Sequence, residues 1–320
     1  MTADVFVTRQ LPEPGVAPLL EGGVEVDYRD DDSGCPVAEL RERSAGVRGM
    51  LTVLSDRLDA ATMDAAGPDL AVVANCAVGF DNIDLAAAAE RGIVVANTPD
   101  VLTEATADLA WALLMATARR IVEGDSLVRS GEWRSPSLVL LLGAPVHAKT
   151  LGVIGMGKIG AAVARRGAGF GMPILYHNRS RRPEVEAELG AEWVELDDLL
   201  ERSDFVSVNA PLNDTSRHLI DAAALARMRP TAILVNAGRG PIVDEVALVE
   251  ALRSGRIAGA GLDVFEREPV LADGLAELDN VVLMPHVGSA TTETRAAMVR
   301  LTGENILAVL AGREPPTPVR

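Results

Sequence analysis

The chain has 320 residues, enough for two domains that each bury a core of their own. Its 48% apolar and 24% charged residues are typical of a folded globular protein and exclude a disordered one. The net charge of −16 opposes nucleic-acid binding, and no uninterrupted apolar run approaches the length of a membrane helix. We therefore expect neither nucleic acid nor a membrane among its partners.

The cysteine content points to a reducing compartment. Cys35 and Cys76 are isolated and form no CxxC pair, so neither a disulfide framework nor a metal site is expected. The first residues show no basic segment followed by an apolar one, as a secretory signal would. The expected location is cytoplasmic. On so acidic a protein, an anionic ligand would need a local arginine-rich site.

The first hundred residues alternate short β-branched runs with helical segments. Helices are expected at residues 58–65 and 84–90, the second with Asp84 as its N-cap. Alternating strands and helices predict a parallel sheet with right-handed crossovers, and therefore a small doubly wound domain. The predicted strands are residues 4–9, 24–28, 50–54, 71–76 and 93–97.

A long helix is predicted next, from an N-cap at Thr103 to about residue 121. A second alternation follows, including helices at 159–170 and 246–254, the latter with Asp244 as N-cap. Six strands make a full dinucleotide-binding sheet of the Rossmann type. No strand follows the last helix, about Thr292–Leu310, so we expect it to pack back on the first domain. The six strands are residues 151–155, 173–177, 205–210, 232–237, 257–264 and 281–284.

A glycine-rich turn predicts a nucleotide site. Gly155, Gly157 and Gly160 form G-x-G-x-x-G between a predicted strand and a predicted helix. Such glycines permit a tight turn, close approach to a pyrophosphate and tight helix–strand packing, while the helix N-terminus faces the phosphates. The motif alone is weak, but here both flanking elements are present.

The end of the second strand indicates which dinucleotide binds. NAD enzymes usually carry an acidic residue there, which accepts hydrogen bonds from the ribose 2′-hydroxyl. This chain has Asn178, Arg179, Ser180, Arg181 and Arg182 instead. Guanidinium groups bind phosphate bidentately, so NADP(H) is favoured, with NAD(H) possible. The alternative is a solvated basic turn without a ligand.

Five segments resemble the D-2-hydroxyacid dehydrogenase family. NAGRG (236–240), GLDVFEREP (261–269) and PHVGSAT (285–291) resemble its signature blocks, and residues 78–84 and 98–119 are similar to its substrate loop and interdomain helix. Matches extend from the first strand to the last helix. Within the family, the chain most resembles glyoxylate and hydroxypyruvate reductases.

The resemblance implies an α/β fold of two doubly wound parallel-sheet domains and a homodimer. Residues 1–98 with 287–320 would form a smaller, flavodoxin-like substrate-binding domain, and residues 99–286 the NAD(P)-binding domain. The implied activity is hydride transfer from NAD(P)H to a small 2-keto acid, glyoxylate or hydroxypyruvate. The aliphatic stretch 137–142 stands where such reductases often have aromatic residues, which leaves the substrate size open.

The resemblance also implies roles for individual residues. Arg239 would bind the substrate carboxylate, His286 would be the general acid, and Glu268 would hold its imidazole. Glu266 lies in the same loop, but the family's acid directly precedes a proline, which selects Glu268. Further implied contacts are Lys158, Ile159, Ala210, Pro211, Thr215, Ala237, Asp263 and Gly288 for the cofactor, and Leu54, Val78 and Gly79 for the substrate.

Carbonyl reduction requires the same residue types. Negative charge develops on the carbonyl oxygen as hydride adds, so a positioned acid and a cation lower the barrier. Two alternatives remain within the family, enzymes of the D-3-phosphoglycerate and D-lactate type. A nucleotide-sensing, corepressor-like binding protein on the same fold is a third. Asp263 is open to a second interpretation, as a structural residue at a strand end.

Overall fold

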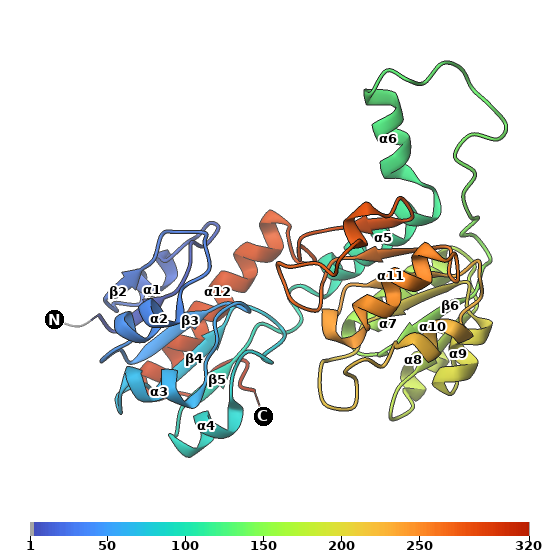
Figure 1. Ribbon diagram of the computed structural model, residues 1–320. Helices are drawn as coiled ribbons and strands as arrows, with labels where there is room; N and C mark the ends of the chain where they lie inside the picture. The colour runs from blue at the N-terminus through green and yellow to red at the C-terminus, as the bar shows by residue number, and fades with distance from the viewer. Residues whose placement is uncertain (1–2, 320) are drawn as a thin grey trace. The chain divides into compact units, whose positions relative to one another are not determined.

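The computed structural model describes residues 3–319, which fold into two compact units. One unit runs to Leu102 and resumes at Ser289, and the other spans Thr103–Gly288. The division predicted from the sequence falls after residues 98 and 286. Every sheet ladder in both units is parallel, and helices alternate with the strands along the chain (Figure 1). The predicted α/β class is confirmed.

The first unit has a five-stranded sheet in the order β2-β1-β3-β4-β5, the flavodoxin-like arrangement. Asp84 caps its helix as predicted, because its side chain accepts a hydrogen bond from the backbone N–H of Ala87. The strands are β1 Val5–Val7, β2 Val26–Tyr28, β3 Gly49–Thr52, β4 Val72–Asn75 and β5 Val94–Ala96. The helices are α1 Ala17–Glu21, α2 Val37–Arg43, α3 Ala60–Ala66, α4 Leu85–Glu90 and α12 Thr292–Leu310.

Both faces of this sheet are covered. Val5 and Val7 pack on one face with Ile306 of α12, whereas Phe6 packs on the other face with Leu40 of α2. Successive strand residues point to opposite faces, so a run of apolar residues buries both. Helix α12 contacts β3, β4 and β5, which brings the end of the chain onto the first unit (Figure 1).

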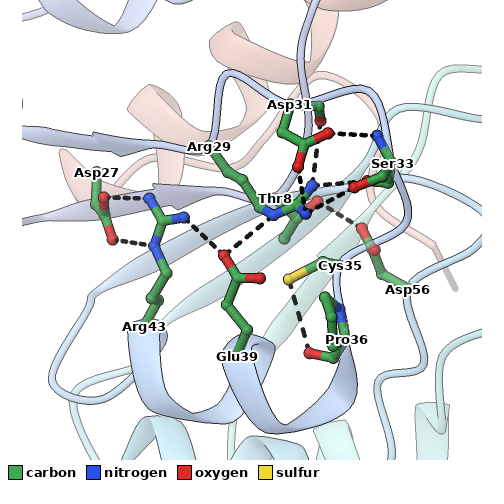
Figure 2. Close-up of polar contacts among 10 residues, drawn as sticks. All are labelled: Thr8, Asp27, Arg29, Asp31, Ser33, Cys35, Pro36, Glu39, Arg43 and Asp56. Atoms are coloured by element: carbon green, nitrogen blue, oxygen red, sulfur yellow. Dashed lines mark hydrogen bonds and ion pairs between the residues drawn. The ribbon is translucent and has the colours of Figure 1, made fainter.

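A polar network fixes the connection between β2 and α2 (Figure 2). The guanidinium of Arg29 is buried and donates to the carboxylates of Asp31 and Glu39 and to the hydroxyl and carbonyl of Ser33. Arg43 binds the same Glu39 carboxylate from α2. A buried guanidinium is tolerated here because its donors are satisfied. These contacts are structural.

The second unit has a seven-stranded sheet in the order β12-β11-β10-β9-β6-β7-β8. The order reverses between β6 and β9, so a ligand site is expected at the carboxyl ends of these strands. The strands are β6 Leu151–Ile154, β7 Ile174–His177, β8 Glu192–Trp193, β9 Phe205–Val208, β10 Ile233–Asn236, β11 Gly259–Leu262 and β12 Val281–Leu283. The helices are α5 Thr103–Ala118, α6 Ile121–Arg129, α7 Lys158–Gly169, α8 Pro183–Leu189, α9 Leu196–Arg202, α10 Ala222–Arg227 and α11 Glu245–Arg253, with 3-10 turns at Gly240–Ile242 and Leu275–Glu277.

Helix α5 corrects the predicted long helix at both ends. Thr103 is its first residue and not its N-cap, and the helix ends at Ala118. Arg120 then adopts a left-handed conformation (φ 53°), and α6 begins at Ile121. The carbonyl of Ala118 instead accepts a hydrogen bond from the N–H of Ala144. The periodic pattern could not show this, because the break depends on a segment that returns more than twenty residues later.

Helix α6 and the segment that follows it project from the rest of the second unit (Figure 1). No residue of α6 is buried. Residues 138–142 of this segment are nevertheless apolar, and Leu138 is 96% exposed, Val139 78% and Leu142 67%. Among residues 3–319, no helix is both long and apolar enough to cross a bilayer.

Candidate active site

The glycine turn has the geometry of a dinucleotide cradle. Gly155 follows β6 with φ 92°, and a Cβ there would stand 2.5 Å from the backbone nitrogen of Ala210. At Gly160 a Cβ would stand 2.1 Å from the carbonyl oxygen of Gly155, so only glycine lets the helix and the turn pack. Around the Gly157 Cβ position, by contrast, no atom lies within 4 Å.

The open space lies at the N-terminus of a twelve-residue helix. Gly157 is the N-cap of α7, and no side chain of residues 3–319 caps it. The first N–H groups of an α-helix have no acceptor within the helix, and the helix dipole favours an anion there. A pyrophosphate fits this cradle.

Asn178 stands at the end of β7, where an NAD enzyme usually has an acid. Its Oδ1 accepts a hydrogen bond of 2.7 Å from the N–H of Met156, in the glycine turn. Its carbonyl accepts a hydrogen bond of 3.0 Å from the indole of Trp193. Asn178 thus ties the strand end to the glycine turn, and no carboxylate occupies the position that selects a ribose 2′-hydroxyl.

The three arginines that follow differ in their partners. Arg179 makes no hydrogen bond or ion pair with any residue in 3–319 and is exposed. Arg181 binds the carboxylate of Glu186 through Nε and Nη2. Arg182 binds Glu184 and also donates to the carbonyl of Met156. The sequence predicted one basic cluster, whereas two of its members are ion-paired.

The residues after β11 and β12 form a histidine–carboxylate pair. His286 has φ 54°, a conformation that is uncommon for a residue other than glycine and is often found at functional sites. Its Nδ1 lies 2.8 Å from Oε2 of Glu268, whose Oε1 accepts a hydrogen bond from the N–H of Phe265. The Nε2 atom makes no hydrogen bond with any residue in 3–319, so it remains to face a ligand.

Electrostatics keep Glu268 ionised. Burial raises the pKa of its carboxyl, but the hydrogen bond and charge of His286, the N–H of Phe265 and the charge of Arg239 together hold it below the ordinary value. An ionised carboxylate on Nδ1 fixes the orientation of the imidazole ring and leaves Nε2 as its second hydrogen-bonding atom. The pair is therefore suited to proton donation from Nε2.

Arg239 follows β10 in a turn built by Asn236. The side chain of Asn236 is buried. It donates a hydrogen bond of 3.0 Å to the carbonyl of Arg239 and accepts one of 3.1 Å from the N–H of Gly238. The next residue, Gly240, touches the loop that carries Glu268, since a Cβ there would stand 1.8 Å from the carbonyl oxygen of Phe265. The structure therefore brings Arg239, Glu268 and His286 to one edge of the sheet.

Asp263 serves the turn that follows His286. Its buried carboxylate accepts hydrogen bonds of 2.7 Å from the N–H of Val287 and 2.8 Å from the N–H of Gly288. Burial raises the pKa of this carboxyl, although the two N–H groups and His286 partly offset the effect. These contacts favour the structural interpretation of Asp263.

The remaining predicted residues fall in two places. Ala210, Pro211 and Thr215 follow β9, and Ala237 follows β10, at the same sheet edge as the glycine turn. In the first unit, Leu54 follows β3, while Val78 and Gly79 follow β4. The carbonyl of Val78 accepts a hydrogen bond from the side-chain amide of Asn97, and the carbonyl of Gly79 accepts one from the side-chain amide of Asn75. Their own N–H groups donate to nothing in residues 3–319, so they can bind an anion.

Two residues that hold the Glu268 loop, Glu245 and His218, are not among those predicted from the sequence. Buried Glu245 accepts hydrogen bonds from the N–H groups of Glu266 and Ala272, at 2.7 and 2.5 Å. His218 Nε2 lies 2.9 Å from Oε1 of Glu266. A signal for Glu245 was present, because it precedes Leu248 by three residues on the apolar face of its helix. His218 gave none.

Comparison with known proteins agrees with this geometry. Residues 111–288 match the family model for the D-isomer specific 2-hydroxyacid dehydrogenase, NAD binding domain. Glyoxylate reductases of Thermococcus onnurineus and Pyrococcus horikoshii are 51% and 50% identical, each over 99% of this chain and 96% of the relative.

Solved structures are similar to this chain over nearly its whole length. A protein of Thermus thermophilus superposes with a TM-score of 0.93 at 47% identity, covering 99% of both chains. An NADPH-dependent glyoxylate/hydroxypyruvate reductase from Sinorhizobium meliloti, solved with NADP and malonate, has a TM-score of 0.88 at 37% identity and covers 100% of this chain and 97% of its own. The chain therefore belongs to the D-isomer specific 2-hydroxyacid dehydrogenase family.

Proposed function

We propose that this protein reduces glyoxylate to glycolate or hydroxypyruvate to D-glycerate, with NADPH as hydride donor. The observation that carries the proposal is the His286–Glu268 pair, placed with Arg239 at the sheet edge that also carries the glycine turn. The relatives at about half identity that are named glyoxylate reductases support the substrate class. The family supports use of a nicotinamide dinucleotide.

In the proposed mechanism, the bound dinucleotide supplies a hydride to the carbonyl carbon of the keto acid. His286 donates the proton on Nε2 to the carbonyl oxygen, and Glu268 stabilises the charged imidazole through Nδ1. Arg239 binds the carboxylate with its guanidinium and helps stabilise the developing negative charge. One hydride and one proton add across the C=O bond, which gives the hydroxy acid.

The first unit is proposed to contribute to substrate binding through the backbone N–H groups of Val78 and Gly79 and the side chain of Leu54. The N–H groups are support for this role, since neither donates within residues 3–319. A carboxylate is the kind of anion that such a pair of amides accepts.

The proposed cofactor preference is NADPH over NADH. Support comes from the absence of an acid at Asn178 and from the guanidinium of Arg179, which no described residue pairs. Ser180 and Arg181 complete the proposed set around the 2′-phosphate. The pyrophosphate would lie on the Gly157 N-cap and the first turn of α7, beside Ala210 and Ala237.

A homodimer and a cytoplasmic location are also proposals. The projecting segment offers exposed Leu138 and Leu142 and an open groove of about 330 Å³, and such apolar surfaces are typical of subunit interfaces. The double substitution Leu138→Asp with Leu142→Asp should convert a dimer to a monomer in light scattering, whereas Val246→Asp on α11 should not. A dimer that survives contradicts the proposed interface. Free Cys35 and Cys76 fit a reducing compartment.

The activity is tested by the absorbance of NADPH or NADH at 340 nm with glyoxylate, hydroxypyruvate, pyruvate and 3-phosphohydroxypyruvate. Rapid oxidation of NADPH with either of the first two is the expected result, and His286→Ala should remove most of kcat. Turnover confined to pyruvate or the phosphorylated acid would replace the substrate assignment. Dinucleotide binding without any turnover would favour a nucleotide-sensing binding protein.

A further inference from the structure

Glu186 on α8 holds one arginine of the basic turn in a two-point ion pair. Its Oε1 accepts from Nε of Arg181 at 3.0 Å, and its Oε2 accepts from Nη2 at 2.5 Å. The Glu186 side chain is 17% exposed, whereas that of Arg181 is 65% exposed. Hydrogen bonds from Arg181 and Tyr176 lower the pKa of Glu186 to about 2, so the carboxylate is ionised throughout the physiological range.

The position of Glu186 is set by the core of the second unit and not by Arg181. Tyr176 of β7 is fully buried, and its hydroxyl donates 2.6 Å to Oε1 of Glu186. The same hydroxyl accepts 2.7 Å from the backbone N–H of Arg182. The tyrosine therefore fixes both the carboxylate and the basic turn, so Arg181 meets an acceptor that is already in place.

We infer that Glu186 weakens the preference for NADP(H) over NAD(H) by competing with the 2′-phosphate for Arg181. The inference rests on the proposed function and deepens it. Glu186 occupies the Nε and Nη2 donors, which form one edge of the guanidinium that suits a phosphate, so Arg181 must leave the carboxylate to bind the phosphate through that edge. Arg179 can bind the phosphate without first breaking an ion pair, because it is paired with no described residue. NAD(H) lacks the phosphate and is unaffected.

The test compares the binding of NADP⁺ and NAD⁺ to the folded protein by titration calorimetry, without keto acid. Glu186→Gln keeps an acceptor for the Tyr176 hydroxyl but removes the charge. NADP⁺ should bind roughly 2- to 5-fold more tightly to it, the range that exposed ion pairs give, and NAD⁺ affinity should not change. Unchanged or weaker NADP⁺ binding would overturn the inference, because Glu186 would then orient Arg181 for the phosphate or play no part.

Two controls separate competition from a general loss of negative charge. Glu188→Gln removes one charge from the same helix, but its partner is Arg165 on α7, so NADP⁺ affinity should stay at the parent value. In a protein that already carries Arg181→Gln, the further change Glu186→Gln should not increase the affinity for NADP⁺. An equal gain in either control contradicts the inference. If the parent protein binds neither dinucleotide, the proposed function itself fails, whereas binding with an unchanged NADP⁺/NAD⁺ ratio in Glu186→Gln contradicts the inference alone.

Discussion

Replacement of Gly240 by alanine should damage the site without touching a proposed reacting group. A Cβ at Gly240 would stand 1.8 Å from the carbonyl oxygen of Phe265 and 1.9 Å from its carbon, so the two segments must separate by about 1.5 Å to reach ordinary contact. One segment carries Arg239 and the other carries Glu268. Both are fixed by hydrogen bonds to the buried side chains of Asn236 and Glu245, so the strain is expected to move the site residues themselves.

The expected effect is large because catalysis depends on position. A displacement of about 1 Å can cost on the order of 100-fold in rate, and overpacking costs about 1–3 kcal/mol of stability. We therefore expect kcat/KM for glyoxylate to fall by about 100-fold in Gly240→Ala. NADP⁺ affinity should stay close to the parent value, because the glycine turn lies after a different strand.

Gly169→Ala is the matched control in the same unit. No atom lies within 4 Å of its Cβ position and its φ is not positive, so alanine should be neutral or slightly stabilising. Steady-state kinetics at 340 nm and thermal unfolding would be measured for both variants. A folded Gly240→Ala protein with kcat/KM within about 3-fold of the parent would refute the view that these two backbones must stay in contact.

Three further predictions concern buried or paired side chains. Glu245→Ala leaves two N–H groups without their acceptor, so it should lower the free energy of unfolding by about 2–4 kcal/mol. The free energy is measured by tryptophan fluorescence during unfolding in urea. Glu250 is exposed on the same helix, and Glu250→Ala should change the free energy of unfolding little. The pKa of Glu268 is lowered in the folded state, so its charge stabilises the fold above the unfolded value near pH 4.5 and this contribution is lost as the pH falls through the folded pKa. Unfolding free energies measured from pH 6 to pH 3 should therefore fall less steeply in Glu268→Gln, and parallel curves would contradict the lowered pKa. Burial raises the thiol pKa of Cys35 and Cys76 to about 11, so at pH 8 both should react with a disulfide reagent about 100-fold more slowly than unfolded thiols, and fast labelling of the folded protein would contradict that burial.

Local patterns in the sequence were sufficient for the alternation of strands and helices and for the sheet edge that carries the site, although they predicted only six of the seven strands of the second sheet and missed β8. β-branched runs, the glycine turn and the N-caps Asp84 and Asp244 each depend on residues a few positions apart. Such short-range signals predict a parallel sheet, and the topology of a parallel sheet then places its functional loops at the carboxyl ends of the strands. Hence the sequence alone assigns Arg239 and His286 to one edge of the sheet.

The choice of partner for each polar group was decided only by the tertiary structure. Glu266 and Glu268 lie two residues apart, yet one contacts His218 and the other contacts His286. Arg179 and Arg181 are equivalent in the sequence pattern, yet of the two only Arg181 is ion-paired with Glu186. Hydrogen bonds and ion pairs require two groups within about 3 Å, and folding brings those groups together from distant positions in the chain. Periodicity along the sequence carries no information about that distance.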